Sequence, residues 1–214
     1  MIHRPHLELL LATNNAGKIR EIQQSFADVS VNLRYLREFP LVSAVEEIGG
    51  TYEENAMLKA VSYSKQTGLC ALADDSGLEV DALGGGPGVL SARYGGDSDE
   101  ERTETLLKAL ALRSLPERTA RFVCCLALAG WQSGQSVGTK GDPRVLYICK
   151  EKCEGLIGAA PRGKNGFGYD PVFVPAGYDM TFAELSSAVK NAISHRAKAI
   201  ATMRDFLNCW IAST

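Results

Sequence analysis

Two adjacent aspartates, Asp74 and Asp75, follow a short apolar stretch and are followed at once by Ser76 and Gly77. Adjacent carboxylates repel each other, so the pair is unfavourable unless a cation or water compensates it. Mg²⁺ selects oxygen ligands near phosphates, and one carboxylate can bind the metal while the other accepts a proton from an attacking water. Asp-Ser-Gly is also good turn chemistry. Taken alone, the run fits a metal site and an ordinary turn about equally.

The segment from 13 to 18 could hold phosphate. It reads Thr-Asn-Asn-Ala-Gly-Lys and lies between an apolar run and a helical pattern. Lys18 would lie in the first turn of that helix, where the helix dipole is already positive, so a lysine is unfavourable there. It becomes favourable if an anion binds at this end and is also held by the free backbone N–H groups. A Lys18 that points into water is the more ordinary alternative. The segment is not a Walker A loop, because position 12 is Ala and Lys18 is followed by Ile19, which disfavours a P-loop ATPase.

A second group of charged and amide side chains lies at the start of a predicted helix. Glu46 and Glu47 precede the helix, and Asn55 and Lys59 are four residues apart, so they share one helix stripe. A magnesium site normally needs a further carboxylate from another segment, which Glu46 or Glu47 can supply. A solvated charged edge is the more common explanation of such a group when no other feature is considered.

A third group lies in the last quarter of the chain, in the run Gly-Phe-Gly-Tyr-Asp-Pro at 166–171 and in Lys190 and Ser-His-Arg at 194–196. An aromatic ring between two glycines, as at Phe167, suits stacking on a base. Lys190, His195 and Arg196 could contact phosphate or a keto oxygen. The alternatives are a loop residue that packs on the core for Phe167 and a surface helix position for His195.

The elements that would position these residues alternate between strands and helices, which predicts an α/β fold. The predicted strands cover 7–12, 69–73 (ending at the two aspartates), 121–129, 144–149 and 171–174. Four helices are predicted. The first carries Ile19, Ile22 and Phe26 on one face, and the second runs from a Thr51–Glu54 capping box to Gly68. The third covers 101–112, and the fourth closes the chain over 193–207. The segment 131–142 is predicted to be a turn or variable loop.

Composition narrows the class of protein. The chain has 214 residues, enough for one core or for two lobes sharing a sheet. Its net charge of −2 and pI of about 6.0 argue against a nucleic-acid polymer as partner. No apolar run is long enough to span a membrane. No signal peptide is evident, and the six cysteines lie mostly in apolar stretches, so we expect reduced thiols in a cytoplasmic protein.

Taken together, these motifs resemble the inosine triphosphate pyrophosphatase family, whose members hydrolyse non-standard purine triphosphates. The matching runs are Thr-Asn-Asn-Ala-Gly-Lys at 13–18, Glu46 with Thr-Tyr-Glu-Glu-Asn-Ala at 51–56 and Lys59, Ala-Asp-Asp-Ser-Gly at 73–77, Pro-Gly at 87–88 with Ser-Ala-Arg-Tyr at 91–94, Gly-Phe-Gly-Tyr-Asp-Pro at 166–171, and Ile-Ser-His-Arg at 193–196. Each run is weak alone, but they occur in the family's order and span almost the whole chain. Position 14 is Asn where the family often has Gly, and Asn tolerates left-handed backbone angles nearly as well.

The resemblance implies a single domain of α/β class, with an elongated mixed central sheet flanked by helices. It further implies two lobes sharing that sheet, an active site in the cleft between them, a homodimer, a purine nucleoside triphosphate as substrate and Mg²⁺ as cofactor. The residues that it implies for substrate binding are Thr13, Asn14, Asn15, Ala16, Gly17, Lys18, Lys59, Ser76, Phe167, Gly168, Tyr169, Asp170, Lys190, His195 and Arg196. It implies Glu46, Asp74 and Asp75 around the metal, with Asp75 as the catalytic base.

The reaction expected from the resemblance is hydrolysis of ITP, dITP or XTP to the monophosphate and pyrophosphate. A phosphomonoesterase of the aspartyl-phosphate type, which releases orthophosphate, would need Asp-x-Asp rather than adjacent aspartates. A non-catalytic nucleotide-binding module would be expected to lose the carboxylates, which are present here. The segment 131–142 carries no motif of the family, so no function is assigned to it.

Overall fold

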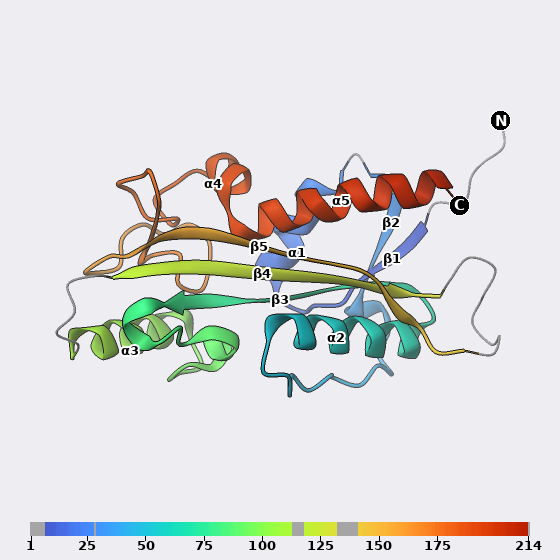
Figure 1. The fold of residues 1–214 in the computed structure, drawn as a ribbon, viewed down its shortest axis with the longest axis horizontal. Helices are drawn as coiled ribbons and strands as arrows, with labels where there is room; N and C mark the ends of the chain where they lie inside the picture. The colour runs from blue at the N-terminus through green and yellow to red at the C-terminus, as the bar shows by residue number, and fades with distance from the viewer. Residues whose placement is uncertain (1–6, 28, 113–117, 132–140, 214) are drawn as a thin grey trace. The chain divides into compact units, whose positions relative to one another are not determined.

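The computed structural model describes residues 7–27, 29–112, 118–131 and 141–213. They form a mixed sheet of six strands in the order β2-β1-β3-β4-β5-β6, with helices packed along it (Figure 1). β1 pairs in parallel with both β2 and β3, whereas β5 and β6 are antiparallel. The predicted α/β class and mixed central sheet are therefore confirmed.

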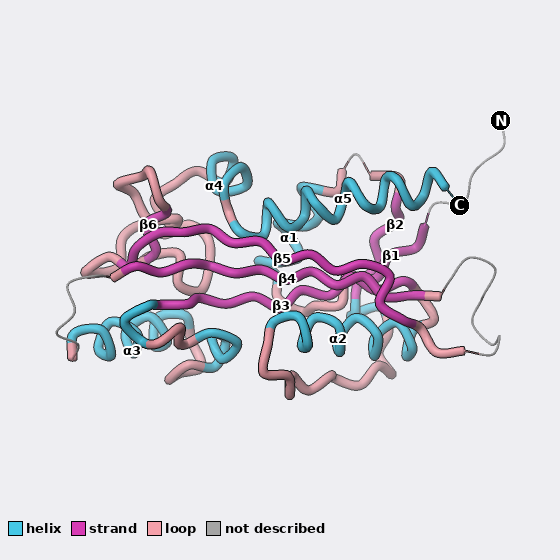
Figure 2. Tube along the Cα trace, viewed as in Figure 1, coloured by secondary structure: helices cyan, strands magenta, loops and turns pink. Residues whose placement is uncertain are grey.

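Figure 2 shows how strands and helices alternate along the chain. The strands are β1 (Leu7–Leu11), β2 (Val31–Tyr35), β3 (Cys70–Val80), β4 (Thr119–Gly130), β5 (Arg144–Ile157) and β6 (Phe173–Pro175). The helices are α1 (Ala16–Ser25), α2 (Tyr52–Thr67), α3 (Asp99–Ala111), α4 (Ser187–Ile193) and α5 (His195–Ser213), with short 3-10 helices at Leu36–Glu38, Asp81–Leu83 and Gly88–Arg93. None of these described helices is long and apolar enough to cross a membrane.

The chain divides into two compact units. Unit 1 comprises Met1–Asp75, Cys125–Lys150 and Ala199–Thr214, and unit 2 comprises Ser76–Cys124 and Glu151–Lys198. β3, β4 and β5 each contribute residues to both units, and in β3 the boundary falls between the two residues Asp75 and Ser76.

In unit 1, helices α2 and α5 cover opposite faces of the sheet (Figure 1). The alternation of side chains along β5 produces this arrangement, because consecutive residues of a strand point to opposite faces. The Tyr147 ring stacks on Phe206 of α5 with 4.2 Å between ring centroids, whereas the Lys150 ammonium lies 2.9 Å from a Glu53 carboxylate oxygen in α2. The buried core between these layers consists of aliphatic side chains, including those of Leu9, Leu10, Leu11, Ile22, Leu72, Leu126, Leu128, Met203 and Leu207.

In unit 2, the core is built around three phenylalanine rings. The Phe122 centroid lies 4.7 Å from that of Phe173, and the Phe173 centroid lies 5.1 Å from that of Phe182. Leu106 and Leu110 present the apolar face of α3 to this cluster. Tilted and offset aromatic pairs of this kind add to the free energy gained by burying the rings.

The predicted ends of α2 are confirmed. The Thr51 side chain accepts from the Glu54 N–H, and the Glu54 carboxylate accepts from the Thr51 N–H, which completes the capping box. At the other end Gly68 has a φ of 74° and ends the helix.

The predicted end of the strand before the aspartates was wrong. β3 continues through Asp74 and Asp75 to Val80, so the Asp-Ser-Gly run is strand rather than turn. Two features outweigh the local turn preference. Leu78 and Val80 are fully buried in unit 2, and the two aspartates have cationic or amide partners that compensate their charge inside the sheet.

Two further predictions needed correction, and two elements were not predicted. The strand predicted at 144–149 extends to Ile157, and β2 and α4 were not predicted. The closing helix is broken at Ser194, whose backbone is extended (ψ 155°) and whose hydroxyl accepts from the Ala197 N–H, so that α5 begins at His195. Most of the predicted variable loop at 131–142, namely 132–140, lies outside the described residues.

Replacement of Gly68 tests the αL end of α2. Because an L-residue at φ 74° is strained, Gly68→Ala should lower the free energy of unfolding by about 1 kcal/mol, measured by urea denaturation. Gly50, just before the same helix, is the matched control: a Cβ there would meet only the Glu54 carboxylate, at 3.8 Å. Equal losses in Gly68→Ala and Gly50→Ala would contradict the explanation.

Candidate active site

The aspartate pair lies just beyond the end of a parallel strand. β1 ends at Leu11, which pairs with Leu72 of β3, and the Ala12 N–H still donates to the Leu72 carbonyl at 2.8 Å. β3 then continues past the end of β1 to Asp74 and Asp75, with β4 as its other neighbour in the sheet. The ends of parallel strands are where α/β proteins place their ligands, and here the strand that ends is β1 rather than β3, which the sequence predicted to end.

The loop after β1 brings a lysine to the first aspartate. The Asn15 side chain accepts from the Lys18 N–H at 3.0 Å and caps α1, and the Thr13 hydroxyl accepts from the Asn15 N–H at 3.2 Å. The Lys18 ammonium forms an ion pair with Asp74, whose side chain is almost fully buried. The first turn of α1 contains no acidic residue, so its positive end has no negative side chain within the helix.

Lys59 of α2 joins three acceptors around the second aspartate. Its ammonium donates to the Glu47 carboxylate at 2.5 Å, to the Asp74 carbonyl at 2.7 Å and to the Asp75 Oδ1 at 3.4 Å. Asn55, one turn earlier in α2, donates to the Asp75 Oδ2 at 3.2 Å. Both oxygens of the Asp75 carboxylate are therefore held by side chains of one helix stripe, as the four-residue spacing of Asn55 and Lys59 suggested.

Asn55 is itself fixed by the loop that carries the glutamates. The Gly49 N–H donates to the Asn55 Oδ1 at 2.8 Å, and the Asn55 amide donates back to the Gly49 carbonyl at 3.3 Å. A Cβ at Gly49 would lie 2.8 Å from that Asn55 oxygen, so only glycine allows this approach. The sequence pointed to the spacing of Asn55 and Lys59 but gave no sign that the Asn55 amide would contact the Asp75 carboxylate.

Burial and neighbouring charges shift the acid–base properties of this cluster. Burial raises the pKa of the Asp75 carboxyl; Lys59 opposes this shift, yet the pKa stays above its ordinary value. Burial alone would lower the pKa of the Lys59 ammonium, but Asp75 and Glu47 outweigh it and raise that pKa. Asp75 is thus a carboxylate with increased affinity for a proton, next to a lysine that stays charged.

The oxygen atoms of this cluster suit a hard cation. Three carboxylates, those of Asp74, Asp75 and Glu47, meet at the ammonium groups of Lys18 and Lys59. Within the described part of the chain, no group of three or more His, Cys, Asp or Glu side chains is arranged to hold a metal by itself. Mg²⁺ in proteins is usually bound by one or two carboxylates together with water and substrate phosphates. Glu46, predicted for this role, is exposed, whereas its neighbour Glu47 makes the contact with Lys59.

A second cluster, in unit 2, surrounds the ring of Phe167. The Lys190 ammonium lies 4.9 Å from the ring centroid, and the Arg196 guanidinium carbon lies 5.5 Å from it. Lys190 also donates to the Asp170 Oδ2 at 2.6 Å, and both of these side chains are buried. Two cations close to an aromatic ring form a site for a flat, electron-rich ligand with acceptor atoms at its edge.

Ser76, His195 and Arg196 complete the unit 2 cluster. Arg196 donates to the Ser76 hydroxyl at 2.8 Å, which ties the first turn of α5 to β3. The His195 ring stacks on Phe122 with 4.7 Å between centroids and an interplanar angle of 10°, and it is buried. The surface position that was the alternative for His195 is therefore excluded.

Tyr169 and Gly168 stabilise the loop that carries Phe167. The Tyr169 side chain is buried in the unit 2 core, its hydroxyl donates to the Ser91 carbonyl at 3.0 Å, and burial raises its pKa. The Gly168 N–H donates to the Asp99 carboxylate at 2.6 Å. The predicted site residues thus form two groups, one in each unit. Among the contacts of the described residues, neither Asn14 nor Ala16 forms a side-chain hydrogen bond with a member of either group.

Buried carboxylates with lysine partners beyond a parallel strand, and an aromatic ring flanked by cations, lie on one α/β fold. The chain belongs to the Ham1 family, whose model matches residues 9–206.

Similar proteins cover nearly the whole chain. It is 42% identical, over 95% of its own length and 97% of the relative, to a protein of Bacillus anthracis named dITP/XTP pyrophosphatase. Its structure resembles that of a HAM1 protein from Coxiella burnetii, with a TM-score of 0.81 and 42% identity over 94% of this chain and 98% of the other. The Staphylococcus aureus Ham1 protein gives a TM-score of 0.79 and 39% identity over the same shares of the two chains.

The buried Lys190–Asp170 pair can be tested through stability. Lys190→Met removes the ammonium partner of a buried carboxylate and should lower the free energy of unfolding by about 3 kcal/mol, measured by chemical denaturation. The double variant Lys190→Met/Asp170→Asn should lose less, because no buried charge remains. Lys108→Met, which removes an exposed lysine paired with Glu104, is the control and should change stability by less than about 1 kcal/mol. A Lys190→Met variant as stable as this control would refute the interpretation.

Proposed function

We propose that this protein hydrolyses non-standard purine nucleoside triphosphates, such as ITP, dITP and XTP, to the monophosphate and pyrophosphate. The observation that carries the proposal is the buried Asp75 carboxylate, whose pKa is raised and whose two oxygens are held by Asn55 and Lys59. Membership of the Ham1 family, with relatives named dITP/XTP pyrophosphatase, supports this substrate class.

The triphosphate end of the substrate would bind at the loop 13–18 and Lys18. The Lys18 side chain keeps 16% of its surface exposed while its partner Asp74 keeps 1%, so an incoming phosphate can reach the ammonium. Phosphate oxygens at the start of α1 would also accept hydrogen bonds from the backbone N–H groups that the helix leaves unpaired. Lys18 would then offset charge that develops on the phosphate during the reaction.

Asp74 and Asp75 would hold Mg²⁺, together with Glu46 or Glu47. When bound, Mg²⁺ would neutralise charge on the phosphate oxygens and orient the attacking water. The donor set fits this ion because it consists of carboxylate oxygens, the ligands that Mg²⁺ prefers. Glu47 has the stronger structural support of the two glutamates, through its contact with Lys59.

Asp75 would act as the base. A water held against its carboxylate gives up a proton to Asp75, and the water oxygen bonds to the α-phosphorus. The bond from that phosphorus to the bridging oxygen breaks, and pyrophosphate leaves with the bonding electron pair. A raised pKa makes Asp75 a better proton acceptor, and the contacts with Asn55 and Lys59 keep the carboxylate in place.

The purine would lie against Phe167. Hypoxanthine and xanthine carry a keto oxygen at position six, which can accept a hydrogen bond from Arg196 or His195. Adenine carries an amino group at that position and would leave such a donor without an acceptor, which costs roughly 1–3 kcal/mol. Ser76, which accepts from Arg196, directly follows Asp75 in β3.

The homodimer, the cytoplasmic location and the exclusion of nucleic-acid polymers stay predictions from the sequence. A phosphatase that releases orthophosphate is the main rival activity, and a non-catalytic nucleotide-binding module is the rival from another class. The adjacent, compensated carboxylates favour the pyrophosphatase over both.

A substrate and product survey tests the proposal directly. Purified protein with Mg²⁺ should convert ITP, dITP and XTP to monophosphate and pyrophosphate, with kcat/KM at least about tenfold above that for ATP. Ion-exchange chromatography of the nucleotides and separate assays for pyrophosphate and orthophosphate provide the measurement. Equal turnover of ATP, or orthophosphate as the sole inorganic product, would refute the proposed function.

Two aspartate variants test the division of roles. Asp75→Asn should lower kcat by about a thousandfold or more while nucleotide affinity persists, since the amide cannot accept the proton. Asp74→Asn should instead raise the Mg²⁺ concentration needed for half-maximal rate. Asp142→Asn, at an exposed aspartate paired with Lys65, is the matched control and should behave as wild type. Wild-type turnover in Asp75→Asn would remove Asp75 from the role of base.

A further inference from the structure

The two backbone N–H groups on either side of the Phe167 side chain are each held by a carboxylate. The Phe167 N–H donates to the Asp170 Oδ2 at 2.9 Å, and the Gly168 N–H donates to the Asp99 Oδ2 at 2.6 Å. The Phe167 carbonyl also accepts from the Asp170 N–H at 3.3 Å. Asp170 lies in the same loop, but Asp99 comes from the first turn of α3, far away in the sequence.

The loop needs such anchors because glycines flank the ring. Gly166 and Gly168 have φ values of 79° and 62°, and glycine backbones are the least restricted of all. A Cβ at Gly166 would lie 1.9 Å from the Asp170 Oδ2, so glycine is required for that carboxylate to reach the Phe167 N–H. A ring on a free glycine loop would have to be ordered each time a ligand binds, which weakens affinity.

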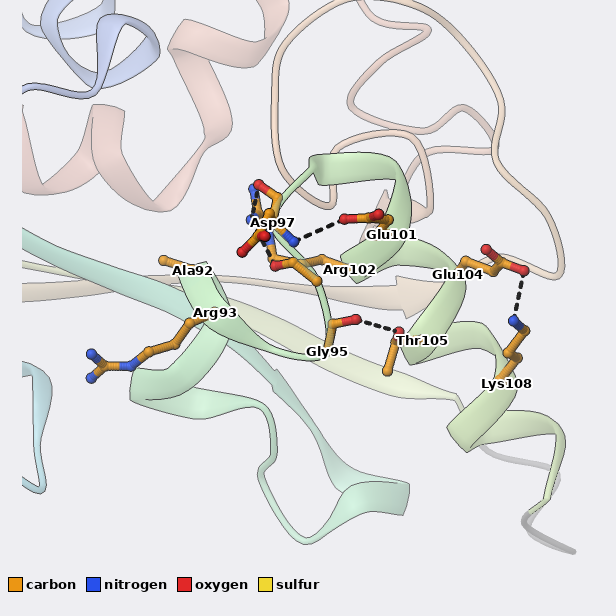
Figure 3. A pocket seen from close by; sticks show the side chains of 10 residues that line it. Ala92, Arg93, Gly95, Asp97, Glu101, Arg102, Glu104, Thr105 and Lys108 are labelled. Atoms are coloured by element: carbon orange, nitrogen blue, oxygen red, sulfur yellow. Dashed lines mark hydrogen bonds and ion pairs between the residues drawn. The ribbon is translucent and has the colours of Figure 1, made fainter.

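Asp99 is oriented by a side chain of its own helix. Arg102 forms an ion pair with Asp99, and its guanidinium also donates to the Gly96 carbonyl at 3.2 Å and the Asp97 carbonyl at 2.9 Å. Arg102 and the segment 95–97 line a pocket of about 560 Å³. Figure 3 shows the labelled side chains of this pocket, among them Thr105, whose hydroxyl donates to the Gly95 carbonyl. The acidic first turn of α3 is thus fixed from both sides.

We propose that Asp99, oriented by Arg102, is a positioning residue that holds the Phe167 ring ready for the purine. This inference rests on the proposed function, because it assigns Phe167 to the base. Asp99 touches neither the phosphates nor the water in this scheme, so it should affect the affinity for the nucleotide and leave the chemical step unchanged. It would act through the Gly168 N–H and not through a contact with the ligand.

The variant Asp99→Ala tests the proposal in steady-state kinetics with ITP. It should raise KM by about fivefold, the effect of one lost hydrogen bond, with kcat within about twofold of wild type. Asp99→Asn keeps an acceptor oxygen for the Gly168 N–H and should restore at least part of the lost affinity. Hydrogen exchange of a peptide spanning 166–169 should be faster in Asp99→Ala than in wild type.

Glu104→Gln is the matched control, since Glu104 is an exposed acid on the same helix and pairs only with Lys108 among the described contacts. It should match wild type in KM and in exchange. An unchanged KM in Asp99→Ala, or a parallel fall in kcat and thermal stability that Asp99→Asn does not restore, would overturn the proposal. If wild-type protein does not release pyrophosphate from ITP, the proposed function fails instead, and the exchange experiment still shows whether Asp99 anchors the loop.

Discussion

The compensation of two buried, adjacent carboxylates is the constraint on which the rest of unit 1 depends. Asp74 and Asp75 are 2% and 5% exposed in the middle of a strand, where uncompensated charge would be highly unfavourable. Lys18 reaches one of them and Lys59 the other, so α1 and α2 must begin at defined residues. The Asn15 cap and the Thr51 capping box fix those starting points, and local capping chemistry therefore determines where the two buried carboxylates can be tolerated.

Unit 2 also contains a buried carboxylate whose charge is compensated, but its partners differ from those in unit 1. Its buried aspartate, Asp170, accepts hydrogen bonds from the Lys190 ammonium and the Phe167 N–H. The exposed fraction of the Lys190 side chain is 8%, against 16% for Lys18. The less exposed pair fixes a loop, because Asp170 also accepts from the Phe167 N–H. The Lys18–Asp74 pair joins the start of α1 to β3. One kind of interaction, a lysine on a buried aspartate, thus supports a loop in one unit and a helix start in the other.

The sequence predicted what depends on local chemistry and missed what depends on distant partners. The caps of α2 and the lysine at the start of α1 follow from residues within one or two helical turns, and they were predicted. The continuation of β3 beyond Asp74, the capping of α5 by Ser194 and the link from Asp99 to Gly168 depend on neighbours that only the fold brings close. Glu46 and Glu47 illustrate the limit, because adjacent identical residues cannot be told apart without knowing which one faces Lys59.

The continuation of β3 also explains how neighbouring aspartates can have different tasks. Consecutive side chains of a strand point to opposite faces, and the contacts agree: Asp74 pairs with Lys18 of α1, whereas Asp75 is held by Asn55 and Lys59 of α2. A turn at this position would not impose that alternation and could leave the two charges side by side. In the strand, one carboxylate faces the partly exposed Lys18, and the other lies among donors of α2 that keep it in place. The pleat of a single strand therefore gives two adjacent carboxylates different partners and different surroundings.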